Sequence, residues 1–135
     1  MVTGGCLCGA IRFEIDADAL GGGFCYCRDC QVVSGGMPGA VMVFPRGAYR
    51  LLKGDPKIHM STSDQGVRVG RAFCPDCGTH LSAWNEHHQA IIPVRVGALD
   101  QPSAFAPSAN LWTRSAQPWH RPDRGLQCFE TQPEG

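Results

Sequence analysis

The sequence predicts an all-β fold with almost no helix, and two observations lead to this prediction. Short apolar runs, one of them with strict alternation of apolar and charged residues, recur along the chain between turns rich in glycine and proline. Only one short segment has the pattern of a helical turn. We therefore expect roughly six to eight short strands, arranged as a sandwich or a folded-over sheet.

The first predicted elements lie in residues 10–33. Residues 10–16 place Ile, Phe and Ile on one face and charged residues on the other, which indicates a half-buried strand. Three glycines at 21–23 interrupt the pattern. A helical turn is expected over residues 28–33, with Asp29 near its start and Ser-Gly-Gly after its end.

The remaining elements are predicted as strands followed by a long connection. The expected strands cover residues 40–44, 49–53, 57–62, 67–73, 81–84 and 89–99. Pro93 interrupts the last of these and favours an edge position or a bulge over a central strand. Residues 100–122 contain four prolines and read as an irregular segment anchored by aromatic side chains such as Trp112 and Trp119, to which we assign no site role.

Length and charge restrict the class of protein. With 135 residues and no dividing linker, we expect a single domain over residues 1–135. Basic and acidic residues both number 12, so no basic surface predicts a nucleic-acid partner. No segment approaches the roughly 20 apolar residues that span a bilayer, and no secretion signal is present, so we expect a cytoplasmic protein without membrane contact.

Two glycine-flanked cysteine pairs predict a closed metal site. Cys74 and Cys77 form a CxxCG knuckle, a turn that directs two thiolates toward one metal. Two ligands do not complete a structural zinc site, and Cys6 with Cys8 in GCLCGA is the matching second pair. Isolated pairs could also be buried thiols or redox dithiols, but the recurrence of the pattern favours zinc. We expect these four thiolates to hold a structural zinc.

A third cysteine group lies in FCYCRDC and supplies only three thiols, Cys25, Cys27 and Cys30. Three protein ligands with one open position are typical of catalytic zinc, where water or substrate completes the coordination. Cys128, the remaining cysteine, is the rival fourth ligand and would make this a second closed site. The five histidines are scattered, and we assign none of them to a metal.

The combined cysteine pattern resembles a known family. GGCLCGAIRFE, CYCRDCQVVSGG and RAFCPDCGTHL, together with VGALDQPSAFAPSANLWTRSAQPW nearer the C-terminus, resemble the glutathione-dependent formaldehyde-activating enzyme and centromere protein V family. The resemblance covers nearly the whole chain. It implies a zinc-binding fold of the β-tent type, with a structural zinc on Cys6, Cys8, Cys74 and Cys77 and a second, activity-related zinc on Cys25, Cys27 and Cys30.

The resemblance also implies an activity. The family's founding reaction is that of a carbon–sulfur lyase, an S-(hydroxymethyl)glutathione synthase that joins glutathione to formaldehyde. We therefore expect a zinc-dependent lyase acting on the adduct of a small thiol, such as glutathione, and a small aldehyde. Tyr26 stands where the family commonly has histidine, so a proton-transfer role at that position is lost and the substrate can differ.

Two other classes of function compete with the lyase. The first is a zinc-stabilised interaction module without catalysis, as the centromere-associated relatives suggest. The second is a redox enzyme with Cys128 as its nucleophile, although GLQCFE has no recognisable partner motif. Turnover measurements separate the first alternative from the lyase, and a Cys128→Ser variant tests the second.

Overall fold

The structure is a computed structural model that describes residues 1–133, and it confirms the predicted all-β fold with little helix. Eleven strands and one α-helix, joined by short 3₁₀ turns, make up this part of the chain. The strands are β1 (Val2–Gly5), β2 (Arg12–Ile15), β3 (Gly21–Cys25), β4 (Gly39–Pro45), β5 (Tyr49–Lys53), β6 (Lys57–Thr62), β7 (Arg68–Phe73), β8 (His80–Asn85), β9 (Ile91–Arg95), β10 (Ala109–Leu111) and β11 (Gln127–Cys128), and the helix is α1 (Arg28–Val33).

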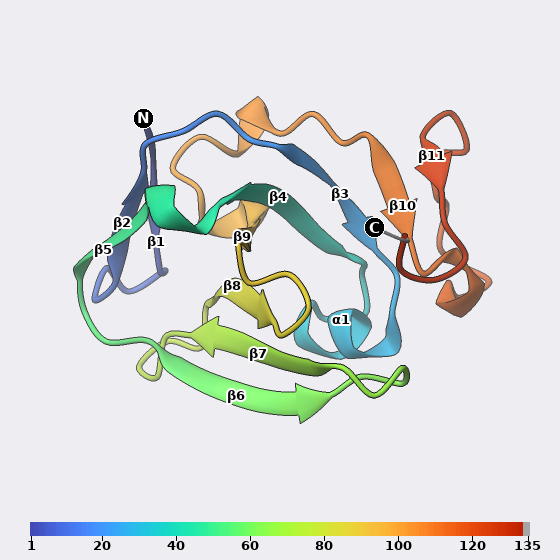
Figure 1. The fold of residues 1–135 in the computed structure, drawn as a ribbon, viewed down its shortest axis with the longest axis horizontal. Coiled ribbons are helices and arrows are strands. Elements are labelled where there is room, and N and C mark those ends of the chain that lie inside the picture. Colours follow the sequence, from blue (N-terminus) through green and yellow to red (C-terminus); the bar gives the residue numbers. More distant parts are fainter. Residues whose placement is uncertain (134–135) are drawn as a thin grey trace.

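The strands form two sheets of unequal size. A small sheet has the order β1-β2-β5, and a large sheet has the order β11-β10-β3-β4-β9-β8-β7-β6. The chain passes from the large sheet to the small one through the 3₁₀ turn Arg46–Ala48, which joins β4 to β5. Figure 1 shows the large sheet curving from β3 and β4 round to β6 and β7, with the small sheet at one end and α1 at the other.

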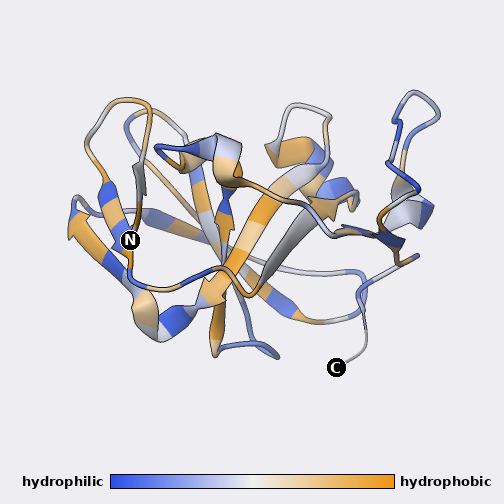
Figure 2. Ribbon diagram, turned by 90° about the horizontal axis from the view of Figure 1, so that it is seen from above, coloured by the Kyte–Doolittle hydropathy of each residue, from blue (hydrophilic) through white to orange (hydrophobic). Residues whose placement is uncertain are grey.

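The main core lies where the small sheet packs on the large one. The predicted alternation over residues 10–16 is confirmed, because Ile11, Phe13 and Ile15 are all buried. They pack in one cluster with residues of the large sheet, among them Phe44 of β4 and Val94 of β9. Figure 2 shows hydrophobic and hydrophilic residues alternating along several strands, as expected for sheets with one buried face.

The predicted helical turn is α1, over the predicted residues. Cys27 is its N-cap, and its Sγ accepts a hydrogen bond from the Cys30 backbone N–H at 3.3 Å. The buried amide of Gln31 donates to the backbone oxygens of Tyr26 and Ser115 and so ties the helix to the C-terminal segment. Within residues 1–133 no helix has the length and apolar character needed to cross a bilayer.

Four strands were not predicted from the sequence, namely β1, β3, β10 and β11. Strand β3 illustrates the reason. Its three glycines, 21–23, were expected to interrupt structure, yet all three pair with β4, and Gly23 also pairs with Ala109 of β10. A Cβ on Gly23 would lie 2.2 Å from the backbone oxygen of Ala109, so only glycine allows β10 to approach this closely. Glycine weakens the sequence pattern that predicts a strand, but the close packing of β3 on β10 requires it.

The expectation for Pro93 was wrong. Its strand, β9, lies inside the large sheet between β4 and β8 instead of at an edge. Pairing with β4 extends over five residue pairs, but pairing with β8 is confined to Ser82 and Val94. A proline without an N–H is tolerated in an interior strand here because one of its two ladders is short.

An ion pair joins the small sheet to the segment after β9. Arg12 of β2 donates from Nη1 to Asp100 Oδ1 at 2.9 Å, and Thr3 of β1 donates to Asp100 Oδ2 at 2.7 Å. The hydrogen bond from Arg12, followed by that from Thr3, lowers the pKa of Asp100 to about 2. The carboxylate is therefore held in its charged form by the folded protein.

We expect Asp100→Asn to lower the free energy of unfolding at neutral pH. Because the pKa of Asp100 is lower in the folded than in the unfolded state, its contribution is fully present above about pH 4 and is lost as the pH falls toward 2. Urea unfolding of both proteins between pH 7 and pH 2 tests this. A stability difference that stays constant over this range would contradict it.

Candidate metal centres and the adjoining cleft

The first candidate centre brings together two cysteine pairs from distant parts of the sequence. Cys6 and Cys8 follow β1, and Cys74 and Cys77 lie in the turn between β7 and β8. All four sulfurs lie within 4.8 Å of one another. The Sγ atoms of Cys6 and Cys8 are 3.6 Å apart, and those of Cys8 and Cys74 are 3.8 Å apart.

Each pair lies in a tight turn that ends on a glycine with positive φ. Gly9 has φ 80° and donates its N–H to the Cys6 backbone oxygen; Gly78 has φ 78° and donates to that of Cys74. Residues with side chains rarely adopt this conformation. The turn also presents backbone N–H groups to sulfur, since Ile11 donates to Cys6 Sγ at 3.2 Å. Both glycines thus shape a sulfur-binding turn.

The spacing and electrostatics of this four-cysteine group fit zinc. A tetrahedral ion with Zn–S bonds of about 2.3 Å keeps its sulfurs about 3.8 Å apart, close to the separations found here. Hydrogen bonds from Thr79 lower the pKa of Cys77 to about 5. A hydrogen bond from the Ala10 backbone lowers the pKa of Cys8, but the neighbouring thiols, Cys6 first, outweigh it and raise that pKa to about 12. Thiols that compete for negative charge in this way are suited to share a cation.

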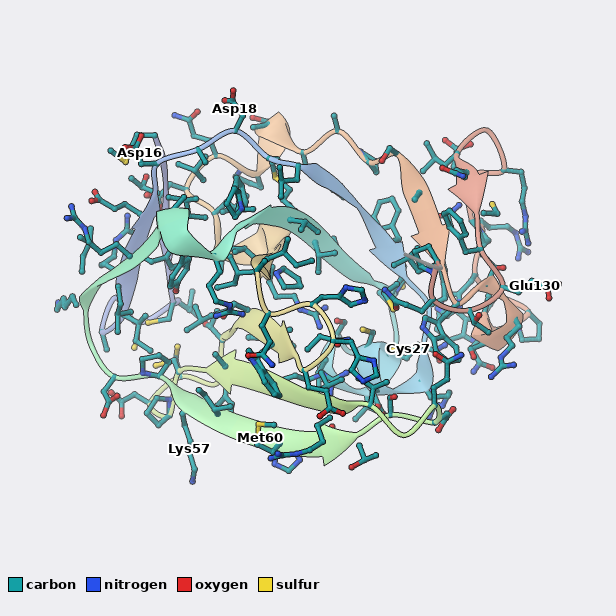
Figure 3. The ribbon with its side chains drawn as sticks, in the orientation of Figure 1. Asp16, Asp18, Cys27, Lys57, Met60 and Glu130 are labelled. Atoms are coloured by element: carbon teal, nitrogen blue, oxygen red, sulfur yellow. The ribbon has the colours of Figure 1, made fainter. Side chains whose placement is uncertain are left out.

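The second candidate centre lies where β3 meets α1. Cys25 ends β3, Cys27 caps the helix and Cys30 lies in its first turn, and their three sulfurs lie within 4.8 Å of one another. Figure 3 shows Cys27 at this junction, on the inner side of the curved sheet. The three donors are soft thiols at spacings that suit zinc, and among residues 1–133 no fourth cysteine, histidine or acidic side chain completes the group.

A buried guanidinium lies beside this three-cysteine group. Arg95 of β9 places Nη2 at 3.7 Å from Cys30 Sγ. It occupies the space that a side chain at position 39 would need, because a Cβ on Gly39 would lie 2.1 Å from Arg95 Nη1. Contacts with Cys25 and Cys27, together with Arg95, lower the pKa of Cys30, whereas contacts with Cys27 and Cys30 raise the pKa of Cys25. Cys30 is thus the thiol of the group that most readily carries the negative charge.

The three-cysteine group opens into a cleft with a volume of about 460 Å³, a size typical of small-molecule sites. Its floor is one face of the large sheet, built from alternate residues of five strands. These are Cys25 of β3, Val41 and Val43 of β4, Val69 and Arg71 of β7 with Val67 just before that strand, Ala83 and Asn85 of β8, and Ile91, Pro93 and Arg95 of β9. The floor of the cleft is therefore largely apolar, and the three thiols, Arg71 and Arg95 are among its polar groups.

Trp112, to which we assigned no site role from the sequence, belongs to the wall of this cleft. It is the one non-glycine residue with positive φ in residues 1–133, at 58°. The guanidinium carbon of Arg114 lies over its ring, 5.0 Å from the ring centroid. Its N–H donates to the backbone oxygen of Thr131, which holds this conformation. Strained backbone of this kind is common beside binding sites. Trp119, in contrast, is exposed and does not line the cleft.

Cys128 is not part of the three-cysteine group. It lies on β11 at the far edge of the large sheet, exposed to solvent. Its Sγ lies 3.5 Å from Asn110 Nδ2, and no other cysteine is its partner within the described residues. The structure thus gives no support to the alternative hypothesis that Cys128 is the fourth ligand of the second metal site.

Tyr26 lies between two cleft cysteines in sequence but does not line the cleft. Its ring is buried and packs edge-to-face on His120, with centroids 5.2 Å apart. Burial raises the pKa of its hydroxyl, so the group stays neutral. The alternation of an extended segment explains this placement: Cys25 and Cys27 face the cleft, and Tyr26 faces the C-terminal segment.

For the lyase expected from the sequence, we therefore predict that Tyr26→Phe keeps turnover within about twofold of wild type, because a hydroxyl outside the cleft transfers no proton to substrate. Steady-state kinetics on the zinc-loaded proteins measures this. A loss of about tenfold or more with unchanged zinc content would show that Tyr26 takes part in the reaction.

Comparison with known proteins identifies a matching family and a matching fold. The family model described as glutathione-dependent formaldehyde-activating enzyme matches residues 1–115. A crystal structure of a Rhodobacter sphaeroides protein from a structural genomics project matches with a TM-score of 0.59 and 18% sequence identity, over 78% of this chain and 97% of that chain. At this identity the structural match shows a shared fold. No curated protein sequence matched the chain.

Proposed function

Because the chain belongs to the glutathione-dependent formaldehyde-activating enzyme family, we propose that it is a zinc-dependent carbon–sulfur lyase for adducts of a small thiol and a small aldehyde. The observation that carries the proposal is the three-cysteine group at the end of the cleft. Its open side faces a space of small-molecule size, so a substrate sulfur or oxygen can reach a metal held there.

Two sets of residues would hold zinc. Cys6, Cys8, Cys74 and Cys77 form the set for a closed structural ion, and Cys25, Cys27 and Cys30 form the set for an open one. When bound at the open set, zinc lowers the pKa of an approaching thiol and polarises a carbonyl oxygen. The placement of the two groups supports this division, since only the second lines the cleft.

The proposed reaction balances without a further co-reactant. In the synthetic direction the thiol sulfur bonds to the aldehyde carbon, the C=O π bond breaks, and the thiol proton ends on the new hydroxyl. The reverse direction breaks the same C–S bond and returns the proton to sulfur. Glutathione and formaldehyde are the pair suggested by the family description.

Residues of the cleft assist this step by excluding water and by balancing the charge of the thiolates. The valines and Pro93 on the cleft floor exclude water from the reacting groups. Arg95 offsets the negative charge of the thiolates through its contact with Cys30. Without this cation, three thiolates would make the bound metal a weaker acid, because they more than neutralise its charge.

Turnover on a panel of thiols and aldehydes tests the proposal. Adduct formation and cleavage are followed by NMR for the zinc-loaded wild type and for Cys27→Ser, with the uncatalysed reaction subtracted. We expect turnover by the wild type with at least one pair. Equal rates for both proteins on every pair would reject the lyase and favour the interaction module without catalysis.

A further inference from the structure

Strand β4 of the large sheet is apolar on both of its faces. On one face, Phe44 is buried in the main core and Met42 packs against that core. On the other face, Val41 and Val43 are half-buried and line the cleft. A strand with one face open to water normally alternates apolar and polar residues. β4 therefore has the composition of a strand that is covered on both sides, although its cleft side is open.

The neighbouring strand β9 repeats this pattern. Ile92 and Val94 belong to the core, whereas Ile91 and Pro93 are half-buried and line the cleft. Val43 pairs with Pro93 in the strand register, so the apolar side chains of the two strands lie side by side. Apolar surface left in contact with water costs free energy, and a ligand with an apolar group would bury it.

This apolar floor, defined as Val41, Val43, Ile91 and Pro93, adjoins the three-cysteine group. Cys25 pairs with Gly39 at the start of β4, and Val41 is the next residue of β4 on the same face. Residues two apart in a strand are separated by about 6.6 Å, so Val41 and then Val43 follow the thiols in two such steps. A molecule that reacts at the thiols therefore has hydrocarbon surface beside it.

Polar residues of the cleft gather at its rim. Asp64 and Gln65 come from the turn between β6 and β7, His88 from the connection between β8 and β9, and Gln132 from the C-terminal segment. Asp64 and Gln65 are exposed to solvent. A ligand that suits this cleft has polar groups that remain near water at the rim and a hydrocarbon part that lies on the floor.

We propose that the apolar floor binds a hydrocarbon chain of the aldehyde, so that the aldehyde substrate is an aliphatic one such as hexanal rather than formaldehyde. This inference rests on the lyase proposed above and names the class of its aldehyde. With glutathione as the thiol, the charged groups of that tripeptide suit the polar rim, because placing them on apolar side chains would remove them from water without a partner. The hydrocarbon on the floor therefore belongs to the aldehyde.

Two unreactive alcohols provide the test. Hexan-1-ol is the alcohol analogue of hexanal, and pentane-1,5-diol has the same number of heavy atoms but ends in a hydroxyl instead of a methyl group. NMR titration of the isotope-labelled, zinc-loaded full chain measures the affinity of each, without thiol or aldehyde. We expect hexan-1-ol to bind tighter by about tenfold or more, with the largest shifts in β4 and β9.

A substitution on the floor locates this preference. Val43→Thr keeps the branched shape but adds a hydroxyl, so it should weaken hexan-1-ol binding by about threefold or more at unchanged zinc content. Val32→Thr is the matched control, because Val32 lies on α1, is 69% exposed and does not line the cleft; it should keep the wild-type affinity. Saturating glutathione should also leave the affinity for hexan-1-ol unchanged.

The outcomes separate this inference from the lyase itself. Equal affinity for both alcohols, or equal affinity of the wild type and Val43→Thr for hexan-1-ol, would overturn the hydrocarbon subsite and leave the turnover measurements to judge the lyase. A preference for hexan-1-ol that weakens in Val43→Thr supports the subsite even if no adduct is turned over.

Two other occupants of the floor would also overturn the proposal. Displacement of hexan-1-ol by glutathione would assign the floor to the thiol instead of the aldehyde. A zinc-loaded dimer, detected by light scattering and dissociated by Val43→Thr, would assign the floor to a second copy of the chain.

Discussion

Cys74→Ser is expected to lower the free energy of unfolding by at least about 5 kcal/mol, because metal affinity at a structural site adds directly to folding. Cys74 is fully buried and, with Cys6, belongs to the main core cluster. The four-cysteine group joins the chain after β1 to the turn between β7 and β8, so its loss also releases two distant segments.

Denaturant unfolding monitored by circular dichroism, together with zinc content, measures this effect. Cys128→Ser is the matched control, because the exposed Cys128 lies outside both cysteine groups; we expect wild-type stability and zinc content for it. A Cys74→Ser protein that unfolds at the wild-type denaturant concentration would mean that the four-cysteine group does not stabilise the fold through a metal.

Cys27→Ser is expected to lower turnover of the thiol–aldehyde adduct by about a hundredfold or more, because Lewis-acid activation contributes several kcal/mol. The substitution removes one thiolate from the three-cysteine group. It should preserve the helix, since Cys27 is the N-cap of α1 and serine is a preferred N-cap residue. Loss of activity would therefore reflect the metal ligand.

Kinetics, zinc content and unfolding are measured together on this variant. The account requires lower turnover and less zinc with little change in stability, and Cys128→Ser again serves as the control. Wild-type turnover in a Cys27→Ser protein that has lost the zinc of the three-cysteine group would contradict a role of that metal in the reaction.

Local signals in the sequence predicted much of the fold. Alternation predicted β2, and the turn residues around residues 28–33 predicted α1, because both depend on neighbouring positions. Strand β3 was missed because its glycines respond to a contact with Ala109, far along the chain. The position of Pro93 was wrong because strand order is a property of the whole sheet. The assignment of residues 1–135 to one domain stays a prediction.

In the candidate site, too, local motifs predicted some residues, whereas only the fold reveals the others. Spacing alone grouped the cysteines as the structure places them, since each group is made of short local motifs. Arg95 had no such signal, because its place beside Cys30 depends on the missing side chain of Gly39. Alternation over residues 67–73 puts Arg71 on the same face as Val67 and Val69, but nothing in the sequence shows that this face lines a cleft.

The central claim is that the chain has one closed and one open zinc site. Zinc X-ray absorption on the fully loaded protein, with metal content per chain, tests it most directly. The account predicts two zinc ions, one bound by four sulfurs and the other by three sulfurs and one lighter atom. It also predicts an unchanged spectrum for Cys128→Ser. Two ions with eight sulfurs, one of them lost in Cys128→Ser, would contradict it.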